Sequence, residues 1–305
     1  MLVIVSEEGE VMQAVMFPNK TDWLIYHAGS YYAIGTMYLD VPDSEVALAA
    51  TQGMLTRLDG GGSTLWSSAY TNDSYSGMTF SKGVMAADSL ILIGDGYDTG
   101  ANSVAGLIHR TDLNGQVMWT TEVALGSDTI ISDICLSPSG LITGSFADIR
   151  YDEKQGFLVG RKGSVFCLDM DGRLLWEFAL DDTLMADYIV PVAGGVLLGN
   201  RSMDLEYDPL QGEGWLLLMD EAGNVKATDS VPDISSGKLE LMGLKTDISG
   251  EPLLYGELLD EPGSASLTFL AWQDLPAIER PEYVSAAAFE IEDKIFVTAP
   301  CLMAQ

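Results

Sequence analysis

The pattern Asp-x-x-Gly-x-x-x-Trp occurs three times in this chain: LDGGGSTLW at residues 58–66, TDLNGQVMW at 111–119 and LDMDGRLLW at 168–176. Each copy lies between two apolar runs with strand character. Weaker copies place turn glycines at Gly9 and Gly223, so that the turns recur every 51 to 57 residues. Glycine suits this position because tight hairpins need a residue that tolerates positive φ. A repeat of this length predicts a modular fold in which each unit buries its apolar face against its neighbours.

Between the turns, each unit contains two further apolar runs, the second of which ends in glycine. The first runs cover 23–27, 77–80, 131–136, 187–190 and 239–244, and the glycine-ending runs cover 32–35, 90–94, 141–144, 196–199 and 253–256. Short apolar runs bounded by turn residues predict strands, and no stretch keeps a helical period. Each unit therefore has four strands, A to D, as in the blade of a β-propeller. The fifth unit is degenerate, with a strand at 267–272, a turn near Leu275-Pro276 and an exit through Ile278.

The two ends of the chain predict how the ring closes. The chain begins with a C–D pair at 2–5 and 11–17, and it ends with an A–B pair at 286–291 and 294–298. Together these pairs complete one blade. The sequence thus predicts a single all-β domain over residues 1–305, a six-bladed β-propeller of four-stranded antiparallel blades, with one blade shared by both ends and no exposed sheet edge between them. The alternative is a segment trimmed from a longer chain, because Met1 falls in the middle of a blade.

On these motifs the chain resembles the PQQ-like family of β-propeller repeats, in which a tryptophan on the outermost strand docks against the next blade. The resemblance spans essentially all 305 residues as architecture, and the motif is strong in three of six units. The quinoprotein pattern has an Asp-to-Trp spacing one residue longer, and its dehydrogenases have more blades, many with an adjacent cysteine pair beside the cofactor. Here Cys135, Cys167 and Cys301 are far apart in sequence. The resemblance therefore implies the fold and argues against the cofactor.

Aromatic and acidic residues on the inner strands are one set of candidate ligand-binding residues. Trp66, Trp119 and Trp176 occupy the same position in successive repeats, which favours packing between blades over stacking on a ligand. Trp23 differs, because A strands line the central channel of a propeller. Polar residues in or beside comparable strands are Asp133, Asp187 and Glu240. They face either a channel ligand or channel water, and the sequence leaves both interpretations open.

The B–C connections are a second set of candidates, because they are predicted as long loops and loops of this length are often functional. Their predicted ranges are 36–53, 95–106, 145–163, 200–214 and 257–266. The acids that follow the strand-ending glycines are Asp40, Asp98, Asp148, Asp204 and Asp260, and Glu206 and Asp208 extend the fourth group. One interpretation is an anionic rim that binds a cation, a sugar or a basic partner. The other, which we favour, is a solvated surface on a protein that is acidic throughout.

Calcium is the first cofactor to consider. Asp95-Gly96-Tyr97-Asp98 offers oxygen ligands near a glycine, but it lacks the twelve-residue loop and distal glutamate of an EF-hand. Asp169-Met170-Asp171-Gly172 falls in a C–D hairpin. We interpret both as turn chemistry and predict no cofactor.

The charge excludes several partners. The chain has 45 acidic and 15 basic residues and a net charge of −30, which repels nucleic acid and anionic membrane surfaces and attracts cations. The apolar runs are strand-sized, so no membrane insertion is predicted, and we expect a monomer. Residues 1–18 show no signal peptide; an extracytoplasmic or a cytoplasmic location depends on whether the natural chain begins upstream. Cys135 and Cys167 fall on strands A and C of one blade, too far apart to bridge, so we expect free thiols.

The search for a catalytic constellation is negative. The two histidines, His27 and His109, fall in different blades, and no nucleophile elbow or phosphate-binding loop is present. Our first hypothesis is a non-enzymatic binding or scaffold propeller whose acidic loop face recognises a protein, a carbohydrate or a cation. The alternative is a carbohydrate-active hydrolase or lyase using carboxylates at the central channel. A quinone- or calcium-dependent oxidoreductase is a third, weaker possibility.

Overall fold

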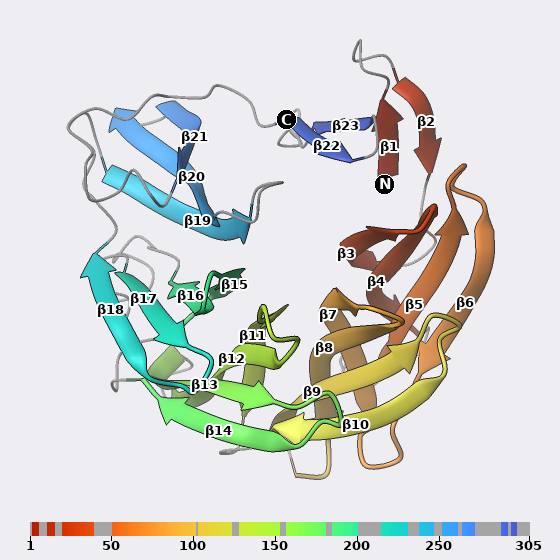
Figure 1. The fold of residues 1–305 in the computed structure, drawn as a ribbon. Helices are drawn as coiled ribbons and strands as arrows, with labels where there is room; N and C mark the ends of the chain where they lie inside the picture. Colours follow the sequence, from red (N-terminus) through yellow and green to blue (C-terminus); the bar gives the residue numbers. More distant parts are fainter. Residues whose placement is uncertain are drawn as a thin grey trace.

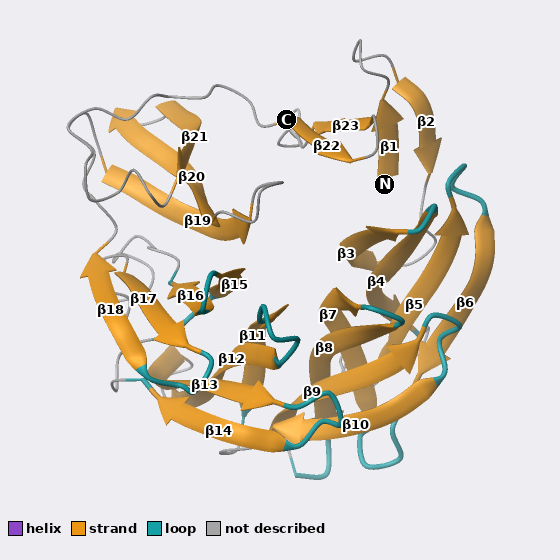
Figure 2. Ribbon diagram, viewed as in Figure 1, coloured by secondary structure: helices purple, strands orange, loops and turns teal. Residues whose placement is uncertain are grey.

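The structure of this chain is a computed structural model. It describes residues 2–5, 11–15, 20–39, 51–101, 103–123, 128–152, 157–180, 185–200, 215–230, 238–246, 252–261, 264–271, 288–291 and 294–297. Every regular element in these ranges is a β-strand (Figure 2). They contain no helix of the length and hydrophobicity needed to span a membrane.

Four sheets are four-stranded and antiparallel, and each is built from consecutive strands. They are β3 (Lys20–His27), β4 (Ser30–Tyr38), β5 (Thr51–Asp59) and β6 (Thr64–Tyr70); β7 (Gly77–Ala86), β8 (Ser89–Asp98), β9 (Ser103–Asp112) and β10 (Val117–Val123); β11 (Thr129–Leu136), β12 (Ile142–Asp152), β13 (Phe157–Leu168) and β14 (Leu174–Ala179); and β15 (Tyr188–Val192), β16 (Gly195–Gly199), β17 (Trp215–Asp220) and β18 (Val225–Ser230). In Figure 1 the first strand of each sheet lies toward the centre of the molecule and the fourth lies at the periphery. The arrangement is propeller-like, as the repeat predicts.

The remaining strands belong to the fifth unit and to the two ends. The fifth unit contains β19 (Lys238–Thr246), β20 (Pro252–Glu261) and β21 (Ser264–Ala271) in one sheet. The ends form two pairs, β1 (Leu2–Val5) with β2 (Val11–Val15), and β22 (Ala288–Ile291) with β23 (Lys294–Val297). β23 lies beside β1 (Figure 1). The strand expected to leave through Ile278 falls outside the described residues.

The repeated motif forms the hairpin between strands C and D, and its aspartate organises the turn. Asp112 Oδ1 accepts hydrogen bonds from the backbone N–H of Asn114 at 2.9 Å and of Gln116 at 2.8 Å. Gly115 has a φ of 83°, the left-handed conformation that the sequence pattern predicts. The same two bonds recur at Asp59, Asp169 and Asp220. The motif therefore encodes a hairpin turn that is stabilised locally, by the hydrogen bonds of the aspartate side chain and by the backbone conformation of the glycine.

The motif tryptophans pack between sheets, which confirms the prediction. Trp119 Nε1 donates a hydrogen bond to the carbonyl oxygen of Met170 at 2.9 Å, in the hairpin of the next sheet. Its ring covers Gly172 so closely that an added Cβ would lie 2.9 Å from Cε3. Equivalent contacts join Trp176 to Glu221 and Gly223, and Trp66 to Gly115. Two features therefore require glycine at this position: the backbone has a positive φ, and the indole ring leaves no room for a Cβ atom.

Three of the connections predicted as long loops are short, so those predictions are wrong. β8 continues to Asp98, β12 continues to Asp152 and β20 continues to Glu261. The next strands begin at Ser103, Phe157 and Ser264. Charged residues at strand ends resemble loop sequence, but their backbones continue the hydrogen-bonded ladder. Residues 40–50 and 201–214, in the other two predicted loops, lie outside the described residues.

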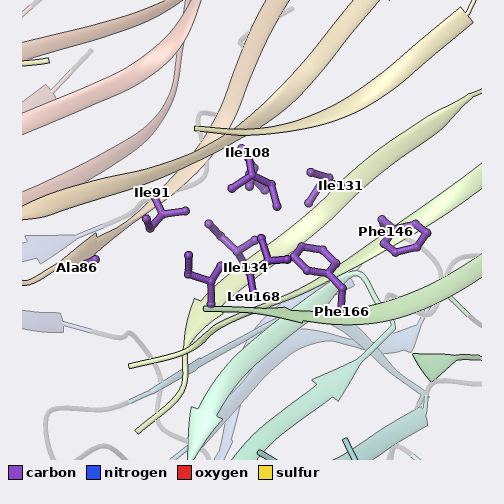
Figure 3. Packing of buried hydrophobic residues seen from close by; sticks show 10 residues of the cluster. Ala86, Ile91, Ile108, Ile131, Ile134, Phe146, Phe166 and Leu168 are labelled. Carbon is purple, nitrogen blue, oxygen red and sulfur yellow. The ribbon is translucent and has the colours of Figure 1, made fainter. Parts of the chain in front are cut away.

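The apolar core lies largely between neighbouring sheets. In the cluster of Figure 3, Ile91 and Ile108 of the second sheet meet Ile131, Ile134 and Phe166 of the third. All five side chains are buried. Each sheet therefore buries its faces against its neighbours, as expected for a repeat whose single unit has no closed core of its own.

Two cysteines are buried free thiols, as predicted. Thr143 on β12 lies opposite Cys135 on one side and Cys167 on the other, so the central strand separates the two sulfurs. Burial raises the pKa of both thiols. Cys301 lies outside the described residues.

A buried histidine in the second sheet predicts a pH-dependent stability. His109 Nδ1 lies 2.8 Å from the Thr120 hydroxyl, its ring packs edge-on against Phe80, and its buried Nε2 has no hydrogen-bond partner within the described ranges. Burial lowers the pKa of His109 to about 4. Between about pH 6.5 and 4 the unfolded chain binds a proton at this residue and the folded chain does not, so stability falls as the pH falls, by up to about 1.4 kcal/mol per pH unit.

Urea denaturation at pH 7, 5.5 and 4.5 measures this contribution when wild type and His109→Gln are compared. Asp95 acts in the opposite sense, because burial raises its pKa to about 7 and protonation below that pH favours the folded chain. The difference between the two proteins isolates the histidine. If the glutamine variant loses stability as steeply as wild type below pH 6.5, His109 is not the group responsible.

Candidate functional site

Irregularities in the inner strands decide which side chains meet at the centre. β3, β7, β11 and β19 each contain a β-bulge, at Asp22, Ser81, Ser132 and Met242 respectively. A bulge inserts one residue against the partner strand and redirects the side chains around it. The residues that follow the first three bulges are Trp23, Lys82 and Asp133, at corresponding positions in successive sheets.

These three side chains form a continuous chain of contacts across neighbouring sheets. Lys82 Nζ lies 4.5 Å from the centroid of the Trp23 ring and forms an ion pair with Asp133 Oδ1. Asp133 also accepts hydrogen bonds from the backbone N–H of Ile134 at 2.7 Å and of Ile189 at 3.1 Å. The contacts thus link the inner strands of four sheets, β3, β7, β11 and β15. We call Trp23, Lys82 and Asp133 the inner relay.

Asp133 is the buried member of the inner relay, whereas Trp23 and Lys82 are partly buried. Asp133 is 3% exposed. Burial raises the pKa of its carboxyl, while Lys82 and the two backbone N–H groups oppose that shift. A second lysine approaches from the fifth unit, with Lys245 Nζ 6.0 Å from the centroid of the Trp23 ring. Burial, and repulsion from Lys82, lower the pKa of Lys245.

The bulges also border a cavity beside the inner relay. The cavity measures about 340 Å³ and lies between the second sheet, the third sheet and the segment before β15. Its lining residues are Ser81, Asp95, Ile130, Ile131, Ser132, Ala147, Met185 and Asp187. The two serines are the bulged residues of β7 and β11. One residue of each bulge therefore lines the cavity, and the next makes the ion pair of the inner relay.

Asp95 is the unusual group in the cavity lining. Its Oδ1 is buried without a hydrogen-bond partner in the described part of the chain. Burial raises the pKa of the carboxyl to about 7, and a hydrogen bond with the Thr79 side chain opposes the rise. Asp187 brings a second carboxyl to the same cavity from the segment before β15. Two acids and two hydroxyls thus share a small space with apolar walls.

The structure brings together only some of the residues predicted from sequence. Trp23 and Asp133 belong to the inner relay, and Asp187 lines the cavity. Asp98 ends β8, and its Oδ1 accepts hydrogen bonds from the N–H of Gly100 and Ala101, which is turn chemistry as predicted. Asp148, Glu240 and Asp260 lie on strands β12, β19 and β20. Asp40, Asp204, Glu206 and Asp208 lie outside the described residues.

Sequence reasoning missed both lysines and misread Asp95. The strand predicted at 77–80 in fact runs to Ala86, so Lys82 was placed beyond its end. Asp95 was read as part of a turn, but it lies within β8 and pairs with Thr79 and Gly106, so that reading is wrong. A search of the extended inner strands for any charged residue, basic or acidic, would have found Lys82 and Lys245. The described residues contain no group of three or more His, Cys, Asp or Glu side chains able to hold a metal ion.

Comparison with known proteins supports the fold and leaves the activity open. No family model and no curated protein matches the chain. A Dyadobacter fermentans protein of unknown function is similar over 86% of this chain and 81% of its own, at 10% identity and a TM-score of 0.54. A puromycin-hydrolyzing peptidase of Mycobacterium tuberculosis is similar over 88% of this chain and 39% of its own, at 14% identity and a TM-score of 0.50. At such identities the likeness shows the fold alone.

Two further similarities are more distant. The chain spans about two-fifths of the length of the peptidases that it resembles, including an acylaminoacyl peptidase of Pyrococcus horikoshii, with 9% identity and a TM-score of 0.48. A europium-containing methanol dehydrogenase is similar over 77% of this chain and 50% of its own, at 12% identity and a TM-score of 0.40. These likenesses do not assign the chain to the PQQ-like family.

Proposed function

We propose that this chain is a non-enzymatic binding or scaffold propeller, and that the face where the inner strands begin recognises its ligand. The observation that carries the proposal is the cavity of about 340 Å³ beside the inner relay, lined by both polar and apolar side chains. Small-molecule sites are concave, mostly apolar and equipped with a few well-placed polar groups. The cavity matches that description at the lower end of the usual volume range.

The bonding of Asp133 favours binding over catalysis at the centre. Its carboxyl is engaged by Lys82, Ile134 and Ile189. A carboxylate held by three donors positions strands and has little capacity left to exchange protons with a substrate. We therefore assign the inner relay a structural role, and the cavity the binding role.

A ligand screen with a cavity-filling variant tests this proposal. The panel comprises calcium, oligosaccharides, basic peptides and small amines, followed by melting temperature and calorimetric titration. We expect at least one class to bind wild type and not Ser132→Leu, whose larger side chain occupies the cavity. Ser67→Leu is the matched control, because Ser67 is exposed on the outer strand β6. Equal binding by Ser132→Leu would place the site elsewhere.

A carbohydrate-active hydrolase or lyase is the second candidate, favoured by one observation. Asp95 and Asp187 line the same cavity, and the raised pKa of Asp95 suits a general acid near neutral pH. A set of chromogenic glycosides separates the two candidates. Turnover that is lost in Asp95→Asn and kept in Asp98→Asn would replace the binding proposal with this one.

The same proposal includes a closed ring of six blades, in which the end pairs β1–β2 and β22–β23 form one blade. Its support is the position of β23 beside β1. Joining the pairs would cover sheet edges that otherwise carry unpaired backbone groups.

Deletion of residues 286–305 tests closure. We expect the truncated protein to aggregate and to melt at a lower temperature, because the edge of β1 loses its neighbour. Size-exclusion chromatography and thermal unfolding measure both effects. A truncated protein that stays monomeric with an unchanged melting transition would show that the ends do not share a blade.

A further inference from the structure

We propose that the cavity beside the inner relay binds a small organic molecule carrying a primary ammonium group, held between the Asp95 and Asp187 carboxyls. This inference rests on the proposed binding function and names the chemical class of the ligand. Its starting observations are the composition of the cavity wall and the bonding of Asp95.

The charge of the wall selects a cation. The lining contains two aspartates and no lysine, arginine or histidine. The nearest basic residue along the chain is Lys82, one residue after the lining residue Ser81, and it is paired with Asp133. Lys82 is therefore committed to the inner relay. An anionic ligand would meet two carboxyl groups and no basic side chain in the lining, whereas a cation would offset the cost of burying the Asp95 carboxyl.

The bonding of Asp95 indicates a ligand that donates hydrogen bonds. Asp95 Oδ1 is a buried acceptor with no partner in the described residues, and such atoms are rare in folded proteins. An ammonium group has three N–H donors. It can serve the Asp95 carboxyl, the Asp187 carboxyl and one of the serine hydroxyls together.

The remaining wall excludes the other common cations. Quaternary ammonium ligands are recognised by aromatic cages, and none of the eight lining residues is aromatic. A bare calcium ion takes six to eight oxygen ligands, more than two aspartates and two serines supply. Ile130, Ile131, Ala147 and Met185 instead provide an apolar surface for a carbon skeleton. The volume suits a ligand of about ten non-hydrogen atoms.

Calorimetric titration with matched probes tests the inference. The probes are phenethylamine, its N,N,N-trimethyl analogue, the neutral alcohol 2-phenylethanol, calcium chloride and glucose. We expect phenethylamine to bind and the trimethyl and alcohol analogues to bind at least tenfold more weakly, because each lacks the donated charge-assisted hydrogen bonds.

Two variants with the same change in charge locate the site. Asp95→Asn should weaken phenethylamine binding about ten- to a hundredfold. Asp98→Asn, at the end of the same strand and outside the cavity lining, should leave binding within twofold of wild type. Melting temperatures of both variants confirm that they fold. If Asp95→Asn does not fold, Asp187→Asn takes its place, with the same expected loss.

The outcomes separate this inference from the proposed function. Binding of glucose, calcium or the alcohol that is lost in Ser132→Leu, without amine binding, would overturn the ammonium assignment and leave the binding function standing. Equal amine binding by Asp95→Asn and Asp98→Asn would also overturn the assignment. Absence of binding by every probe and by the wider ligand panel would overturn both.

Discussion

Replacing Lys82 with methionine should destabilise the protein by about 3–5 kcal/mol, because the change leaves Asp133 buried without its cation. Asp133 would keep only the hydrogen bonds from the N–H groups of Ile134 and Ile189. Methionine preserves most of the volume of the lysine stem, so the loss would report charge more than packing. The variant should also regain stability as the pH falls, since Asp133 then becomes protonated in the folded chain.

An exposed ion pair on a neighbouring inner strand provides the control. Lys20 lies 3.0 Å from Asp22 on β3, and its side chain is largely exposed. Lys20→Met should cost less than about 1 kcal/mol, the usual worth of a surface pair. The double variant Lys82→Met with Asp133→Asn should recover part of the lost stability, because no unpaired carboxylate is then buried. Urea denaturation gives the free energy of unfolding of wild type and the three variants. Equal losses of stability in Lys82→Met and Lys20→Met would contradict the structural role assigned to the inner relay.

Replacing Trp119 with alanine should cost about 3–5 kcal/mol, because the indole joins the second and third sheets. The ring packs against the core cluster of Figure 3 and covers Gly172. Its removal opens space that the glycine cannot fill. It also removes the hydrogen bond to the Met170 carbonyl.

A pair of phenylalanine variants separates packing from hydrogen bonding. Trp66 packs on Gly115 in the equivalent place, but its Nε1 has no partner in the described part of the chain. Trp119→Phe should therefore be more destabilising than Trp66→Phe, by about 1 kcal/mol for the lost hydrogen bond. Thermal unfolding gives both values. A loss below about 1 kcal/mol in Trp119→Ala would show that the ring contributes little to the contact between sheets.

Strand lengths show where prediction from sequence becomes unreliable. Gly77–Ala86 was predicted to end at Phe80, because the bulge at Ser81 interrupts the alternation of apolar and polar residues. The segments that contain Asp98 and Asp148 were assigned to loops because the apolar runs before them end in glycine, but β8 and β12 continue through both segments. In both cases the backbone ladder continues through residues whose side chains suggest otherwise.

Comparison of the two aspartates of β8 shows why the site was harder to predict than the fold. Asp98 organises a turn within three residues of itself, so its role is readable from the local sequence. Asp95 lines a cavity together with residues of the third sheet and of the segment before β15. Its sequence neighbours carry no sign of that environment.

The sequence alone determined the repeating hairpin, the order of the strands and the packing of the motif tryptophans between neighbouring units. These features depend on contacts within a few residues, or on one position repeated in successive units, and such patterns are visible in a linear chain. Only the tertiary structure decided that Trp23, Lys82 and Asp133 meet and that Asp95 shares a cavity with Asp187. Those groupings bring together residues about 50 to 110 positions apart. They depend on bulges that redirect side chains and on the close approach of separate sheets.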